Sequence, residues 1–302
     1  MTPPNVASNQ FYPKGNPLYR LFALWYFCLL MIAWNIVGRT HLGFEQSWMQ
    51  WFAALGVAGG MQVLLEVVDA WSRGRPLRFA GGIGNFLNFF PPAIIAGSAC
   101  SMLLFANENY TPIMLAAAIA IGSKVLLRAP IGGGATQHVF NPSNLGVVLV
   151  LIAYPWVGIA PPNHFTNHVE GIGNLLVPVG IMLSGLFLHW KFTGRLPLLL
   201  GWLGGFVIQG LVRAALFGMP WQVPLYPMTS AAFVIFSNYM VPDPATTPVG
   251  AREQVVFGLL IAGLYGVIIS AHVVFGFFLA LIIACALRGA YLHLYYRWLH
   301  AD

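Results

Sequence analysis

Apolar segments long enough to cross a lipid bilayer recur along almost the whole chain. A spanning helix needs about 20 mainly apolar residues. Eight segments are full-length candidates, at residues 21–38, 48–68, 86–106, 111–127, 174–190, 196–217, 254–271 and 273–290, and two more, at 145–159 and 229–240, are short or end in proline-rich sequence. Only 7% of the 302 residues are charged, so most of the surface has to face lipid. We therefore predict an all-α polytopic membrane protein of about ten transmembrane segments.

The distribution of Lys and Arg supports the count of ten. With a cytoplasmic N-terminus, twelve of the fourteen Lys and Arg residues fall in cytoplasmic regions, and only Arg39 and Arg213 fall outside. This asymmetry is the one that the positive-inside rule describes. Omitting either short segment would destroy it. We therefore expect both termini to be cytoplasmic.

Ten segments allow two halves of five that enter the membrane from opposite sides. A polar arm at residues 1–18 would precede one transmembrane domain at 19–300, with half-repeats at roughly 19–160 and 173–292. Two weak internal matches fall at corresponding positions of the halves: LFANENYTP with IFSNYMVPDPATTP, and HVFNPSNLGVVLV with HVVFGFFLALII. Short, proline-interrupted segments at matching positions are typical of a central binding site in inverted-repeat proteins.

The densest polar motif, GSKVLLRAPIGGGATQHVFNPSN, covers residues 122–144. Its glycine triplet, which includes Gly133 and Gly134, allows the backbone to approach a ligand closely. Asn141 is suited to capping the following helix, and the N–H groups at such a helix start bind anions. The motif predicts either ligand contact through the glycines, Thr136 and the helix start, or a capped loop between two helices.

The second polar motif, FSNYMVPDPATTP, covers residues 236–248. Polar, non-helical backbone at membrane depth is tolerated only beside protein or a cavity. Pro242 and Pro244 fix the backbone around Asp243, whose carboxylate can hydrogen-bond nearby N–H groups. Two interpretations stay open for Asp243: it caps this turn, or it binds a donor on a ligand or a cation.

Other ionisable residues have simpler interpretations. Glu66 and Asp69 end the second segment beside several arginines, so we expect salt bridges there. For Lys124 the alternative to ligand contact is a side chain that extends to the cytoplasmic face. His138 lies within the glycine-rich motif, but no two histidines share a helix at haem-binding spacing, so we expect no haem.

Several classes of function lack their sequence signals. The three cysteines are far apart in apolar segments, without the spacing of a disulfide framework, an iron–sulfur cluster or a structural zinc site. His164 and His168 could pair on a metal, although histidines at the membrane interface are the simpler interpretation. Basic runs interleaved with aromatic residues are absent, which argues against nucleic acid as a partner. We find no catalytic motif that would identify an enzyme.

Two stretches resemble a known membrane-protein family. The sequence GSKVLLRAPIGGGATQHVFNPSNLGVVLVLIAYP (122–155) is similar to a segment of the NqrB/RnfD family. This family comprises NqrB, a membrane component of the sodium-pumping NADH:quinone reductase, and RnfD, a membrane component of the Rnf electron-transport complex. The shared features are a Lys, a glycine-rich turn, an FNP tripeptide and a short segment ending in AYP. The stretch AAFVIFSNYMVPDPATTPVGAREQVVFGLLIAGLYGVI resembles the family's FFMATDPV turn and the helix after it.

The resemblance implies electron transfer with flavin, and in some cases quinone, inside a multi-subunit complex of the bacterial inner membrane. In that family a threonine of an SGAT-type motif, in the loop after AYP, carries FMN covalently. Here that loop has one threonine, Thr166, and no such motif, while GGGAT (132–136) precedes the FNP tripeptide. We therefore expect a flavin (FMN or riboflavin) or a quinone to be bound non-covalently.

These arguments give one expected function and two alternatives. We expect an integral subunit that binds its cofactor between the two short segments and assembles with other, redox-active membrane subunits. The residues expected at the site are Lys124, Gly133, Gly134, Thr136, His138, Asn141, Asn238, Asp243 and Thr246. The alternatives are a transporter or channel for a small solute or ion with a site near the membrane midplane, and a structural scaffold subunit of a larger assembly.

Overall fold

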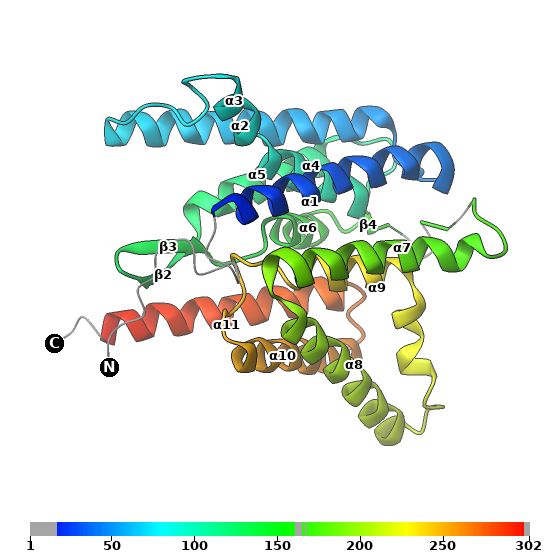
Figure 1. The fold of residues 1–302 in the computed structure, drawn as a ribbon. Coiled ribbons are helices and arrows are strands. Elements are labelled where there is room, and N and C mark those ends of the chain that lie inside the picture. The colour runs from blue at the N-terminus through cyan, green and yellow to red at the C-terminus, as the bar shows by residue number, and fades with distance from the viewer. Residues whose placement is uncertain (1–16, 161–164, 167, 299–302) are drawn as a thin grey trace.

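The computed structural model describes residues 17–160, 165–166 and 168–298, and most of them are helical (Figure 1). The elements of the first part of the chain are α1 (Pro17–Val37) with its π-helical extension η1 (Gly38–Leu42), α2 (Trp48–Arg73), α3 (Ile83–Phe89), α4 (Pro91–Leu103), β1 (Leu104–Phe105), α5 (Thr111–Leu126), β2 (Arg128–Gly132), β3 (Ala135–His138), α6 (Pro142–Ala153) and β4 (Gly158–Ile159). Those of the second part are α7 (Gly173–Leu188) with its π-helical extension η2 (His189–Thr193), α8 (Leu196–Phe217), the 3₁₀ helix η3 (Val223–Thr229), α9 (Ala231–Ile235) with the π-helical turn η4 (Phe236–Met240), α10 (Ala251–Ser270) and α11 (Gly276–Trp298).

The described helices are those of an integral membrane protein. Within the described residues, seven helical stretches are long and apolar enough to cross a bilayer: Leu18–Leu42, Trp48–Arg73, Ile83–Leu103, Gly173–Thr193, Leu196–Phe217, Ala251–Ser270 and Gly276–Tyr296. Three further apolar helices are shorter, at Thr111–Leu126, Pro142–Ala153 and Ala231–Met240. Nearly all of the predicted polar arm lies outside the described residues, since α1 begins at Pro17.

Two segment predictions need correction. The segment predicted at 111–127 is not a full-length span, because α5 has 16 residues and gives way to a strand at Arg128. The segment predicted at 145–159 begins earlier and ends earlier: Pro142 starts α6, and the helix stops at Ala153, just before Tyr154 and Pro155. The predicted segment 86–106 corresponds to the apolar stretch Ile83–Leu103, which has a break at Phe90 between α3 and α4.

The all-α prediction holds for the large elements but omits two small β ladders. Strand β1 pairs antiparallel with β4, and β2 pairs antiparallel with β3. The β2–β3 hairpin is built by the glycine-rich motif, whose Gly132, Gly133 and Gly134 have φ values of 94°, 58° and 74°. Only glycine adopts such values without strain, so this turn explains the triplet.

Helix packing relies on glycine where backbones approach closely. Helix α8 lies along α10, and a Cβ atom added to Gly258 would lie 2.5 Å from Trp202 N and 2.6 Å from Leu198 O. A Cβ added to Gly146 of α6 would collide with the Ala116 carbonyl of α5. Small residues at such contacts are typical of helices that associate within lipid.

Each part of the chain contains the same kind of side-chain contact, a hydrogen bond from a tryptophan to a serine. Trp51 Nε1 of α2 donates to Ser98 Oγ of α4 at 2.9 Å, and Trp202 Nε1 of α8 donates to Ser237 Oγ of η4 at 2.8 Å. Both bonds are buried. Each links the second long helix of its part to the broken segment that follows.

The first long helices of the two parts also end alike. Helix α1 continues into the π-helical η1 and stops at Gly43, and α7 continues into the π-helical η2 and stops at Gly194. Both glycines are left-handed, with φ values of 82° and 65°. In addition, α1 contacts α7, and α6 contacts α11.

Candidate functional site

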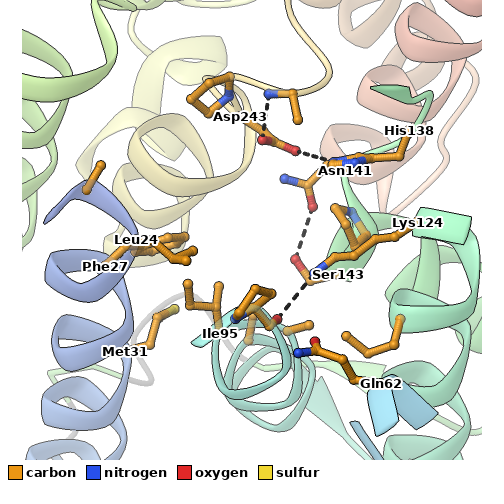
Figure 2. Close-up of a pocket in the computed structure, with 18 of the residues that line it drawn as sticks. Leu24, Phe27, Met31, Gln62, Ile95, Lys124, His138, Asn141, Ser143 and Asp243 are labelled. Carbon is orange, nitrogen blue, oxygen red and sulfur yellow. Dashed lines mark hydrogen bonds and ion pairs between the residues drawn. The ribbon is translucent and has the colours of Figure 1, made fainter. Parts of the chain in front are cut away.

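A cavity of about 890 Å³ lies where the two parts of the chain meet. Its walls come from α1, the last turns of α2, α3, α4, the end of α5, the β2–β3 hairpin, the start of α6, η2, η4 and the segment 242–245. Figure 2 shows polar side chains from α5, β3, α6 and the 242–245 segment on one side, and apolar side chains from α1 and α4 on the other. Small-molecule sites typically enclose about 300–1,000 Å³, so the cavity has room for a cofactor.

The start of α6 forms part of the polar wall. Asn141 Oδ1 accepts hydrogen bonds from the Asn144 backbone N–H at 3.1 Å and from Ser143 Oγ at 3.0 Å. Asn141 Nδ2 donates to the Met240 carbonyl at 3.1 Å. Asn141 therefore caps α6 and also ties it to the end of η4, so that two broken segments from opposite parts of the chain meet at the cavity.

Asp243 has the capping role that its sequence suggested, and its second carboxylate oxygen faces a histidine. Its Oδ1 accepts the Ala245 backbone N–H at 3.1 Å, which is a capping role, while Oδ2 lies 3.5 Å from His138 Nε2 on β3. Burial alone would raise the pKa of Asp243, but the facing His138, the Ala245 N–H and the Lys124 charge outweigh it and hold that pKa below its usual range. The carboxylate is therefore ionised at neutral pH.

Lys124, in the last turn of α5, supplies a cation to the same wall. Its Nζ donates to the Pro92 carbonyl of α4 at 3.3 Å. Figure 2 shows the side chain lying beside Ser143, and Lys124 is half-buried. An ammonium has three N–H donors, and this carbonyl is its one hydrogen-bond acceptor within the described part of the chain, so donors remain for a ligand.

The structure brings six of the nine expected site residues to the cavity and leaves three away from it. The six are Lys124, Thr136, His138, Asn141, Asn238 and Asp243. Gly133 and Gly134 are exposed at the tip of the hairpin. Thr246 is buried and donates to the Asp243 carbonyl at 3.3 Å, so it supports the turn from behind.

Sequence reasoning missed the apolar half of the cavity. Leu24, Phe27 and Met31 of α1 face it, together with Ile95 and other residues of α4. These positions recur at helical spacing, but in a membrane helix the same spacing is produced by faces turned to lipid or to neighbouring helices. The sequence alone carries no signal that separates these cases.

The acidic residues at the end of α2 form the salt bridges expected of them. Glu66 pairs with Arg75 at 2.6 Å and accepts the Arg78 backbone N–H at 2.8 Å, and Asp69 pairs with Arg73 at 2.8 Å. The hydrogen bonds that Arg75 donates to Glu66 and Asp69 raise the pKa of Arg75. This cluster anchors the turn after α2 at the mouth of the cavity.

Comparison with known proteins does not assign the chain to a family. No family model matches it, and a search of curated proteins finds no match. The functional argument therefore depends on the geometry of the cavity.

Proposed function

We propose that the chain is an integral membrane subunit of an electron-transport complex, similar to the NqrB/RnfD family, and that it binds a flavin or a quinone non-covalently in the cavity. The observation that carries the proposal is the cavity itself. It has hydrogen-bond donors and the facing side chains of His138 and Asp243 on one wall, apolar side chains on the other, and it lies where α6 and η4 meet. An apolar pocket with a few convergent polar groups is the usual form of a cofactor site.

The proposed architecture has ten segments in an inverted repeat of five and five. The matching Trp–Ser hydrogen bonds and the matching π-helical ends of α1 and α7 support it. Contacts of α1 with α7 and of α6 with α11 are also those expected if equivalent helices meet at a two-fold axis. In this arrangement both termini are cytoplasmic, in the inner membrane of a bacterium, and the cavity's polar wall lies toward the cytoplasm.

The residues of the cavity fit the carbonyl-bearing ring of a quinone or flavin. Lys124 Nζ is placed to donate to a ring oxygen, and His138 Nε2, facing Asp243, is placed to hold a proton beside the ring. Phe27 and Met31 exclude water from the opposite face. When bound, such a cofactor supplies one- and two-electron redox chemistry, and other redox subunits would be the partners that exchange electrons with it.

A small-solute transporter is the second candidate. Two broken segments that meet at a cavity between repeated halves are also the architecture of many secondary transporters, and Asn141 joins two such segments here. A tightly retained, coloured cofactor would count against this candidate. Substrate-dependent uptake into vesicles that contain the purified protein would support it.

The absorption spectrum of the detergent-purified protein tests the proposal directly. We expect flavin absorption that passes into the supernatant after acid precipitation, or a quinone that appears in an organic extract of the same sample. Colour that stays with the precipitate would show a covalent flavin and contradict the non-covalent attachment. A protein that contains neither cofactor and does not bind either one when it is added would contradict the redox function and favour a transporter or a scaffold subunit.

A further inference from the structure

Three arginines lie where the cavity opens to the surface, and we call them the arginine triad. Arg73 ends α2, Arg78 lies in the connection between α2 and α3, and Arg128 begins β2. All three line the cavity and all three are exposed. Partial burial lowers the pKa of Arg128, and the charges of Arg73 and Arg78 lower it further. The three positive charges are therefore close enough to repel one another, and an anion between them would offset that repulsion.

The carboxylates beside the triad do not balance its charge. Arg75 donates to both oxygens of Glu66 and to one oxygen of Asp69. Arg73 reaches Asp69 only through Nε, at 2.8 Å, and Arg78 Nε lies 3.7 Å from Glu66 Oε2. The triad and Arg75 thus carry four positive charges against two negative ones. Within the described part of the chain no other carboxylate forms an ion pair with them, so an excess of positive charge remains.

The triad also has hydrogen-bond donors to offer. The Arg128 side chain is held in place by bonds from Nε to Thr136 Oγ1 at 2.7 Å, from Nη1 to the Lys124 carbonyl at 2.7 Å and from Nη2 to the Thr136 carbonyl at 2.6 Å. An arginine has five N–H donors, so two remain without an acceptor among the described residues. The Nη groups of Arg73 and Arg78 make no hydrogen bond there either. Guanidinium forks of this kind bind phosphate oxygens in pairs.

The position of the triad indicates the source of a phosphate. The candidate membrane span Trp48–Arg73 ends at its first member, and the next candidate span begins at Ile83. Trp71 is 83% exposed, and tryptophans at the ends of spans are typical of the headgroup region. On α3, Ile83 and Phe86 are exposed apolar side chains. The triad therefore lies at the level of phospholipid headgroups, next to apolar surface that acyl chains can cover.

We propose that the arginine triad binds the phosphate group of an anionic phospholipid, whose headgroup lies at the opening of the cavity and whose acyl chains lie against α3. A soluble phosphate compound would offer the same chemistry, but the location at the ends of two candidate spans favours the lipid. Basic pockets between membrane helices bind anionic headgroups in this way. The inference goes beyond the proposed function, because this lipid is a second ligand and not the redox cofactor.

The test compares phosphatidylglycerol, phosphatidylcholine with the same acyl chains, and inorganic phosphate. Each is titrated into delipidated full-length protein in a nonionic detergent, and binding is measured by calorimetry. We expect phosphatidylglycerol to bind at least about tenfold more tightly than phosphatidylcholine, and inorganic phosphate to bind more weakly than either. Equal affinities for the two lipids would overturn the inference. Inorganic phosphate that binds as tightly as phosphatidylglycerol would show a site for a soluble anion and overturn the lipid as its source.

A substitution with a matched control locates the site. Arg78→Gln removes one charge of the triad but keeps the backbone N–H that Arg78 donates to Glu66 at 2.8 Å. We expect affinity for phosphatidylglycerol to fall about fivefold, with affinity for phosphatidylcholine unchanged. The control is Arg252→Gln, because Arg252 is also exposed and near the end of a candidate span, but does not line the cavity. It should change affinity less than about twofold.

Equal losses in the Arg78 and Arg252 variants would show a general attraction between basic residues and anionic lipid, and would overturn the site. If Arg78→Gln does not fold, Arg73→Gln decides by the same comparison, because Arg75 still pairs with Asp69 in that variant. Flavin and quinone content is measured on the same wild-type preparation. A protein that selects phosphatidylglycerol but binds neither cofactor would contradict the proposed function alone, and a protein with cofactor but no lipid selectivity would contradict this inference alone.

Discussion

Replacing Gly258 by leucine is expected to leave no folded protein, although the substitution is apolar and lies within an apolar helix. At this position a Cβ atom would lie 2.5 Å from Trp202 N and 2.6 Å from Leu198 O, and both of these are backbone atoms of α8. Backbone cannot move aside as a flexible side chain does. Overpacking by a single methyl group typically costs about 1–3 kcal/mol, so alanine should lower the melting temperature and leucine should prevent the α8–α10 contact.

The measurement is the yield of monodisperse protein in detergent together with its melting temperature. The matched control is Gly263→Leu, because Gly263 lies in the same helix, is exposed, and has nothing within 4 Å of an added Cβ atom. We expect this control to fold normally. If Gly258→Leu folded as well as Gly263→Leu, the close approach of α8 to α10 would be wrong.

Asp243→Asn is expected to weaken binding of the proposed cofactor without unfolding the protein. The asparagine keeps an oxygen that accepts the Ala245 N–H, so the turn survives, but it loses the charge that faces His138 and Lys124. Hydrogen bonds to charged groups contribute about 1.5–3 kcal/mol, so we expect affinity for the bound cofactor to fall about 10- to 100-fold. The measurement is cofactor retained per protein after purification, together with the melting temperature.

Asp243→Ala separates the two roles, because alanine removes both the charge and the cap. It should lower cofactor retention as Asn does, and in addition lower the melting temperature. Retention at the wild-type level in the Asn variant would show that Asp243 only shapes the turn.

The folded-state pKa of Asp243 lies below its usual value, so its contribution to stability is complete at neutral pH and declines only below about pH 4. The Asn variant should lack this decline.

The general architecture could be predicted from the sequence because a lipid bilayer requires helices of a certain length with few charged residues. Segment length and the scarcity of charge predicted membrane helices, and the structure contains seven of sufficient length within its described residues. The polar motifs pointed to the cavity for a similar reason: Asn141 and Asp243 are polar groups next to apolar segments and need partners. Those partners, Met240 and His138, come from the opposite part of the chain.

The remaining features depend on interactions between distant residues. The sequence left open whether the glycine triplet contacts a ligand or belongs to a capped loop between two helices. In the structure its φ values serve a hairpin, and the strand that pairs with Arg128 is not visible in a local pattern. The apolar half of the cavity exists because the faces of α1 and α4 that contain Phe27 and Ile95 line the same cavity. Helical spacing describes each face separately and does not say which faces meet.

The π-helical turn η4 makes the cavity sensitive to chain length. It places Asn238, Tyr239 and Met240 along one wall, and a π-helical turn differs from an α-helical turn by one additional residue. Each residue of an α-helix advances by about 100° around the axis, so removing one residue here would turn different side chains toward the cavity. A single-codon deletion or insertion would therefore alter the specificity of this wall in one step, whereas point substitutions would have to change several residues together.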